Sequence, residues 1–278
     1  MLELQGFEQY LIKEERSRNT IECYLRDCRT FIGWYGGRLD DLSELDVIRY
    51  KKHLISTSKT VITANRKLAS VNAFCRYLYE NRTLQDIVGA RLVKNRDKRE
   101  YKGMEEQELR QLRQQIHTGN NPMHICIIEV LLGTGMRVSE LCNLTVKDIL
   151  LTDSKSQIRV LGKGMVNRTL PLNEDARKAV ENYLGVRPDS KEENLLIGQR
   201  GAIGRNAVNL ILEKYGKQIG VEVTPHKLRH SLAYKLVKAG TPMTTIQQIL
   251  GHESILTTNL YTQTAEKDKI EALAGLNW

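Results

Sequence analysis

The sequence predicts a mainly α protein with a small β-sheet, made of an all-helical N-terminal domain followed by a mixed, mostly helical domain. Two observations favour this fold class. None of the five prolines falls within the first 121 residues, so little interrupts helix formation there. Further along, a Gly-Lys-Gly turn separates two short β-like segments. With 278 residues, 41% of them hydrophobic, the chain is long enough for two domains that each bury a core.

The N-terminal domain, residues 1–90, is predicted from two amphipathic helices. Apolar residues recur at helical spacing over residues 19–35, and Ser17 or Asn19 is a suitable N-cap. The same spacing recurs over residues 60–79, where the apolar stripe consists of Ala64, Leu68, Val71, Phe74, Cys75 and Leu78. Arg66 and Lys67 fall away from that stripe, so both cations belong to another face of the helix.

A basic segment, residues 91–102, separates the two domains. No apolar period survives in it, and two acidic residues stand against six cations, which are Arg91, Lys94, Arg96, Lys98, Arg99 and Lys102. The pattern indicates an exposed linker. Most such runs are solvated loops. A linker between two helical units is, however, also suited to following a phosphate backbone.

The second domain, residues 103–278, combines helices with a β-hairpin. We expect helices at residues 105–116, 122–132, 174–184, 206–219, 225–239 and 242–249, and β-segments at 157–161 and 167–172. Thr224-Pro225 and Thr241-Pro242 each place an N-cap candidate before a proline at the first helical position. Gly240 and Gly251 stand where helix C-caps belong.

The charge balance points to a polyanionic partner, because Lys and Arg outnumber Asp and Glu by 42 to 33 and give a net charge of +9. No apolar run approaches the roughly 20 residues of a membrane span. The N-terminus lacks the pattern of a signal peptide. The five cysteines have no CxxC spacing and mostly fall in apolar helical patterns, so we expect reduced core residues of a cytosolic protein.

Missing motifs exclude several kinds of chemistry. The sequence has no GxxxxGK[ST] phosphate loop, no HExxH, no GxSxG elbow, no Cys/His cluster and no obvious set of close carboxylates. We therefore expect neither a metal nor a cofactor. An enzyme of this composition acting on nucleic acid needs cations around the phosphoryl oxygens, a proton donor for the leaving oxygen, and a side-chain nucleophile or an oriented water.

Two segments supply candidate cations. In residues 131–141 an apolar helix stops at two glycines, and Arg137 starts the next helix with Glu140 on the same face, where a carboxylate can fix the arginine rotamer. Lys163 stands between two glycines at a turn tip, where it can give a proton to a leaving oxygen. Taken alone, the first also fits an ordinary surface Arg–Glu pair, and the second a solvent-facing turn lysine.

Two further segments supply candidates for proton transfer and attack. His226, Arg229 and His230 share one face near a helix N-terminus, which favours an anion. His252 follows a helix-ending glycine, and Tyr261 lies nine residues later. Taken alone, His230 fits a hydrogen-bonded structural residue and Tyr261 an aromatic at the edge of the core. A phenol with a pKa near ~10 is a poor nucleophile unless cations or a base support it.

Together, these four segments resemble the tyrosine recombinases, the phage-integrase-type site-specific recombinases. GTGMRVSEL, LGKG, HKLRH and LGHESILTTNLY occur in the family's order, and residues 63–81 resemble the last major helix of its core-binding domain. The resemblance makes the N-terminal domain the core-type DNA-binding domain and the second domain the catalytic one. It implies that Arg137 and Arg229 hold the phosphate oxygens, Lys163 is the general acid, His226 transfers a proton at the nucleophile, His252 donates to the phosphate and Tyr261 attacks phosphorus, with Glu140 and His230 in support.

The resemblance also implies the reaction and the partners. DNA is cut and rejoined through a 3′-phosphotyrosine and a Holliday junction, for resolution, integration or excision. The expected partner is double-stranded DNA with an inverted-repeat core site, held by a homotetramer, with or without a partner recombinase or accessory proteins. The expected DNA-binding residues are Arg66, Lys67, Arg91, Lys94, Arg96, Lys98 and Arg99.

Length favours the minimal two-domain form of the family, as in Xer-type or transposon-encoded resolvases and integrases, working in the bacterial cytoplasm at the nucleoid. Residues 262–278 are expected to dock on a neighbouring protomer, with packing on their own subunit as the alternative. Two other functions stay open. A type IB topoisomerase-like enzyme shares the chemistry, and a non-catalytic DNA-binding regulator shares the charge.

Overall fold

The computed structural model describes residues 2–94, 103–152, 155–161 and 167–251. The chain divides into two compact units, Met1–Arg99 and Glu100–Trp278, which are described separately. Several predicted residues lie outside the described part of the chain. They are Lys163, His252 and Tyr261, the linker cations Arg96, Lys98 and Arg99, and the segment 262–278.

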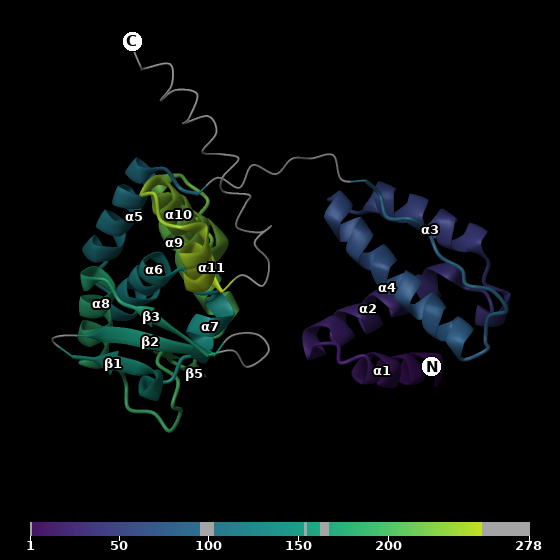
Figure 1. Ribbon diagram of the computed structural model, residues 1–278, viewed down its shortest axis with the longest axis horizontal. Helices are drawn as coiled ribbons and strands as arrows, with labels where there is room; N and C mark the ends of the chain where they lie inside the picture. The colour runs from purple at the N-terminus through teal and green to yellow at the C-terminus, as the bar shows by residue number, and fades with distance from the viewer. Residues whose placement is uncertain (1, 95–102, 153–154, 162–166, 252–278) are drawn as a thin grey trace, which may run out of the picture. The chain divides into compact units, whose positions relative to one another are not determined.

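The first unit is built from helices, as its lack of proline predicts. They are α1 (Leu2–Lys13), α2 (Arg18–Tyr35), the 3-10 helix η1 (Leu39–Asp41), α3 (Glu44–Thr57) and α4 (Val61–Glu80) (Figure 1). Ser17 caps α2 by accepting a hydrogen bond from the backbone N–H of Thr20. Of the two predicted candidates, Ser17 and not Asn19 is therefore the N-cap. Thr60 caps α4 in the same way.

An aromatic core holds these helices together. Phe7, Phe31, Tyr50 and Phe74 come from α1, α2, α3 and α4 in turn, and all are almost completely buried. The rings of Phe7 and Phe74 meet at 5.2 Å between centroids, and those of Phe31 and Tyr50 at 4.8 Å, both edge to face. The predicted apolar stripe of α4 is buried along its whole length, which confirms the face that this helix presents to the core.

Two asparagines of α4 bind the chain that follows it. The side-chain amide of Asn72 donates to the carbonyl of Ala90 at 2.9 Å and accepts from its N–H at 3.1 Å. Asn65 makes the same pair of bonds with Val93, both at 2.8 Å. Residues 91–93, assigned to the linker from the sequence, are therefore held along α4.

The second unit is centred on one buried helix. Its helices are α5 (Glu106–Thr118), α6 (Pro122–Thr134), α7 (Val138–Asn143), the 3-10 helix η2 (Val146–Asp148), α8 (Glu174–Leu184), α9 (Arg205–Ile219), α10 (Pro225–Lys238) and α11 (Met243–Leu250). Every residue from Cys126 to Leu131 of α6 is buried, and α6 packs against α8 and α10. The buried Glu129 of this stretch accepts a hydrogen bond from Nε of Arg113 at 2.8 Å, and this cation compensates its charge.

A three-stranded antiparallel sheet lies at one end of this unit (Figure 1). Its strands are β1 (Ile149–Leu151), β2 (Ser156–Leu161) and β3 (Asn167–Pro171), in that order. Strand β2 pairs with β3 so that Ile158 lies opposite Leu170 and Val160 lies opposite Arg168. Because side chains alternate along a strand, Arg168 projects on the same side as the buried Leu170. The sequence predicted β2 and β3 but missed β1 and the short pair β4 (Ile197–Gly198) and β5 (Gly201–Ala202).

The observed helix ends match the predicted ones where a capping residue next to the helix determines the end. Thr224 caps α10 with Pro225 at its first turn, and Gly251 ends α11 with φ at 63°. Two predictions were wrong. Helix α6 continues through Gly133 and ends only at Gly135. Gly133 allows close packing instead, because a Cβ there would lie 3.0 Å from the Asn173 side chain and 3.2 Å from that of Ala176. Pro242, not Thr241, is the N-cap of α11. Gly240 ends α10 as predicted, with φ at 72° directly after Ala239.

The five cysteines are all free thiols. Cys28 and Cys75 are buried in the first unit, Cys126 and Cys142 in the second, and Cys23 is half-buried. Burial raises the pKa of the Cys75 and Cys126 thiols to about 12. Within the described residues, no helix has both the length and the apolar character that crossing a bilayer requires.

Candidate active site

The turn between α6 and α7 places the first predicted pair. Gly135 ends α6 with φ at 62°, and Arg137 is the N-cap of α7. Glu140 accepts from the backbone N–H of Arg137 at 2.7 Å and from its Nη1 at 3.0 Å. The Glu140 side chain is only 7% exposed, while that of Arg137 is 38% exposed. The pair is therefore a buried carboxylate behind a more accessible arginine, which differs from an ordinary surface pair.

A second arginine, missed in the sequence, binds the same carboxylate. Arg168 of β3 donates from Nη1 to Oε1 of Glu140 at 3.1 Å and from Nη2 to Oε2 at 2.8 Å. Burial alone raises the pKa of Glu140, but the hydrogen bonds from Arg168 and from the Arg137 backbone outweigh burial and leave that pKa below its ordinary value. Glu140 is therefore an anion held between two guanidinium groups.

Arg229 approaches the same region from α10. Its side chain is buried, and the residue is only 5% exposed. Nη1 donates to the carbonyl of Gly135, and Nη2 to the carbonyl of Leu250, both at 2.6 Å. Arg229 thus connects the turn that positions Arg137 with the end of α11.

Three arginines bind three consecutive carbonyls at the end of α11. Ile249 accepts from Arg168, Leu250 from Arg229 and Gly251 from Arg137, at 3.3, 2.6 and 2.8 Å. The last carbonyls of a helix lack partners within the helix and carry partial negative charge, so cations are favourable there. We call this group of contacts the arginine-bound end of α11. It brings the predicted Arg137 and Arg229 together directly before residue 252.

The two histidines of α10 differ in their surroundings. His226 is exposed in the first turn, and His230 is half-buried one turn further on, with ring centroids 6.2 Å apart. Burial, and next the charges of His226 and Arg229, lower the pKa of His230 to about 4. His230 is therefore neutral near pH 7, which suits the supporting position predicted for it.

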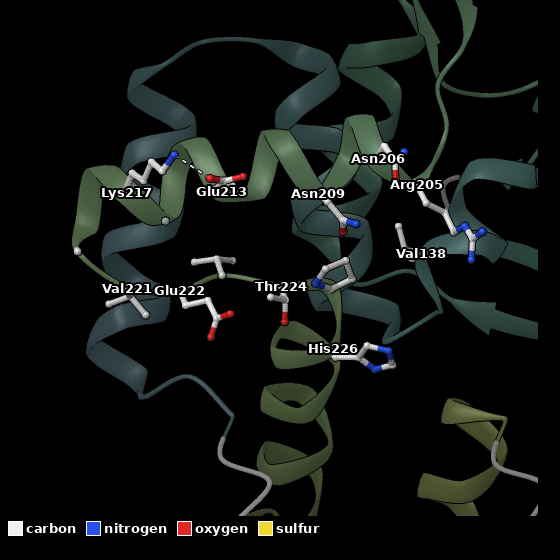
Figure 2. A pocket seen from close by; sticks show the side chains of 14 residues that line it. Val138, Arg205, Asn206, Asn209, Glu213, Lys217, Val221, Glu222, Thr224 and His226 are labelled. Carbon is white, nitrogen blue, oxygen red and sulfur yellow. Dashed lines mark ion pairs between the residues drawn. The ribbon is translucent and has the colours of Figure 1, made fainter. Parts of the chain in front are cut away.

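A pocket of about 1000 Å³ opens beside His226. Figure 2 shows Arg205, Asn206 and Asn209 along α9 on one side of it, with the loop that leads into α10 on the other. Val138, the residue after Arg137, also lines it. The pocket therefore adjoins the start of α7 and the first turn of α10, although neither Arg137 nor Arg229 is among its lining residues.

The predicted DNA-binding cations of the first unit have unequal surroundings. Arg66 forms an ion pair with the buried Asp27, which also accepts from Ser70 Oγ at 3.0 Å, and the Arg66 side chain is 39% exposed. Lys67 is half-buried, while Arg91 and Lys94 are exposed. Arg66 thus contributes to the structure of its own unit, while part of its side chain stays exposed.

Comparison with known proteins identifies the class. A model of the phage integrase family matches residues 102–268, and a model of the phage integrase N-terminal SAM-like domain matches residues 4–82. The chain belongs to the phage integrase family, and it is a tyrosine recombinase, an enzyme of site-specific DNA recombination.

The relatives fit this assignment over nearly their full length. The chain is 32% identical to tyrosine recombinase XerC of Corynebacterium glutamicum over 92% of this chain and 85% of the relative. It is 30% identical to tyrosine recombinase XerA of Pyrococcus furiosus over 99% and 93%. Among solved structures, a crystal structure of XerA recombinase is 26% identical, with a TM-score of 0.56 and 99% of each chain covered.

Proposed function

We propose that the arginine-bound end of α11 is the phosphate site of this recombinase. Arg137 and Arg229 hold the non-bridging oxygens of the scissile phosphate. A guanidinium carries five N–H groups, and Arg137 uses two of them in its side-chain bonds to Glu140 and Gly251. The convergence of these two arginines at residues 250 and 251 is the observation that carries the proposal.

The other catalytic residues act in turn during strand cleavage. The Tyr261 oxygen attacks phosphorus, the bond from phosphorus to the 5′-oxygen breaks, and a 3′-phosphotyrosine forms. His226 takes up the tyrosine proton, Lys163 gives a proton to the 5′-oxygen, and His252 donates a hydrogen bond to the phosphate. The new ester conserves the energy of the phosphodiester, so a 5′-hydroxyl rejoins the strand by the reverse reaction without ATP.

The assembly and its DNA extend this proposal. The enzyme acts as a homotetramer on two duplexes with inverted-repeat core sites, alone or with a partner recombinase or accessory proteins, at the bacterial nucleoid. Arg66, Lys67, Arg91 and Lys94, with Arg96, Lys98 and Arg99, contribute to DNA affinity. Residues 262–278 dock on a neighbouring protomer, and deletion of residues 265–278 that leaves recombination unchanged would refute this part.

The test is a covalent trapping experiment. A duplex is first selected from a randomised DNA pool on the purified Tyr261→Phe protein and is then nicked next to the cleavage point, so that the cut strand diffuses away. We expect a protein–DNA adduct with the wild type and none with Tyr261→Phe, although the variant still binds the duplex. Tyr79→Phe, an exposed tyrosine of the first unit, is the matched control and should form the adduct normally.

The DNA products distinguish a recombinase from the two other candidate functions. Recombinant joints between two duplexes support a recombinase, whereas relaxation of supercoiled DNA without joints supports a type IB topoisomerase-like enzyme. Binding without any adduct supports a non-catalytic regulator. An adduct that survives Tyr261→Phe removes Tyr261 as the nucleophile.

A further inference from the structure

Arg168 belongs to none of the four segments that carry the family resemblance, yet it contacts two parts of the proposed site. We propose that Arg168 is a positioning residue of the recombinase, which holds Glu140 and the end of α11 in place and thereby orients Arg137. This inference rests on the phosphate-binding role proposed for Arg137.

The contacts of Arg168 are the first argument. Its guanidinium reaches Glu140 through two parallel hydrogen bonds and reaches the carbonyl of Ile249 through Nε, at 3.3 Å. The side chain is only 13% exposed. One planar group thus joins β3 to both α7 and α11. A lysine ammonium at the same place is a point charge and does not reproduce the fork that two carboxylate oxygens require.

The path of the main chain at Gly251 is the second argument. A Cβ at this residue would lie 2.8 Å from Nη1 and 2.9 Å from Cζ of Arg168. Gly251 also has φ at 63°, a conformation that side chains disfavour. The backbone at Gly251 therefore passes directly against the guanidinium, so Arg168 is packed closely on the end of α11.

The cost of burying this cation is the third argument. Its neighbours on the inward face of the sheet, Ile158, Val160 and Leu170, are apolar and buried. An apolar residue at position 168 would continue that face, and replacing both members of a buried ion pair, here Arg168 and Glu140, with apolar groups is often neutral or stabilising. Packing alone therefore gives no reason for an arginine, whereas holding a carboxylate and a helix end together does.

The test compares Arg168→Met and Arg168→Lys with Arg159→Met. Arg159 lies on the adjacent strand β2, is exposed and pairs with Asp148 at 3.3 Å, so its replacement removes the same charge from the same sheet. In Arg168→Met, Glu140 retains its bonds to Arg137, so we expect the protein to fold. The readouts are the single-turnover rate of adduct formation on the selected nicked duplex, the affinity for that duplex, and amide hydrogen exchange over residues 245–251.

We expect Arg168→Met to slow adduct formation by about 10- to 100-fold, taking as a guide the loss seen when a residue that orients a metal-binding side chain is removed. Arg168→Lys should recover little of the rate, because it cannot form the fork. Exchange at the end of α11 should accelerate by about tenfold, as expected for losing a hydrogen bond from a charged group. DNA affinity should be unchanged, and Arg159→Met should behave as the wild type in every assay.

The dependence of the rate on pH separates positioning from simple loss of fold. The described groups that face Glu140 are Arg137 and Arg168. Without Arg168, the pKa of Glu140 rises, so the fall in rate at acid pH should begin at a higher pH than in the wild type. Because stability itself falls at acid pH, the folded fraction of each variant is measured by circular dichroism at every pH, and each rate is divided by that fraction before the profiles are compared.

Two results would overturn the inference. One is an Arg168→Met protein with the wild-type rate and pH profile, and the other is unchanged exchange at residues 245–251. Failure of the proposed function looks different, because the wild type then forms no adduct, or the adduct survives Tyr261→Phe. Even then, hydrogen exchange still decides whether Arg168 holds the end of α11.

Discussion

Replacing Gly135 with alanine should destabilise the second unit because this residue is constrained in two independent ways. Its φ of 62° lies in the left-handed region, and a Cβ would come within 2.9 Å of one methyl group of Leu232 and one of Leu250. Leu250 is completely buried at the end of α11, so its side chain moves aside only at a cost in core packing. The carbonyl of Gly135 also accepts from Arg229, so a shift of this turn moves a proposed catalytic residue.

The size of the effect follows from these two constraints. A left-handed conformation costs a residue with a Cβ roughly 1 kcal/mol, and crowding a packed core costs about 1–3 kcal/mol. We therefore expect the free energy of unfolding to fall by about 2–4 kcal/mol. Gly220 is the matched control, because its φ is 69° and a Cβ there meets nothing within 4 Å. Gly220→Ala should therefore cost only about 1 kcal/mol.

Native-state amide hydrogen exchange of α6 measures this difference, since residues 126–131 are buried at the centre of the second unit. Alanine also reduces the conformational entropy of the unfolded chain, but this gain is the same in both variants and cancels in the comparison. Equal destabilisation by Gly135→Ala and Gly220→Ala, within about 0.5 kcal/mol, would refute the argument that Leu232 and Leu250 restrict this position.

Two further predictions concern pH and the first unit. The pKa of His230 is about 4 in the folded protein, below the ordinary histidine value, so the unfolded chain binds the proton first. Stability of the second unit should fall as pH drops through about 6.5 towards 4. In His230→Gln, thermal unfolding should show a weaker fall over this window, and an unchanged fall would contradict the assignment. Asn72→Ala removes both hydrogen bonds that the backbone of Ala90 makes to the Asn72 side chain. Tryptic cleavage after Arg91 should then be about fivefold faster, equivalent to ~1 kcal/mol. Equal cleavage rates would mean that Asn72 does not hold this segment.

The sequence predicted those features that depend on near neighbours in the chain. Ser17 and Thr224 cap helices through hydrogen bonds to residues three positions away, and Glu140 lies one turn from Arg137, so their spacing alone was informative. No spacing pattern in the sequence marks Arg168. Its partner Glu140 is 28 positions away and its partner Ile249 is 81 positions away, and only the folded chain brings them together.

The same distinction explains the errors. A glycine in a helix usually suggests an end, but Gly133 is explained by its close approach to Ala176, which belongs to a different helix. Asn65 and Asn72 appear in the sequence as polar positions of an amphipathic helix, and their bonds to Val93 and Ala90 depend on how the chain returns along α4. Strand β1 has three residues, too few for an alternating pattern to be recognised.

The buried cysteines report on the opening of each unit separately. Thiolate is the reactive form of cysteine, and a buried thiol with a raised pKa reacts only after the surrounding structure opens. Cys28 and Cys75 belong to the first unit, and Cys126 and Cys142 to the second, while the half-buried Cys23 provides an internal standard for fast labelling. Alkylation of the unmodified protein followed by peptide mass spectrometry therefore times the opening of the two units separately, within one sample and with the DNA bound or absent.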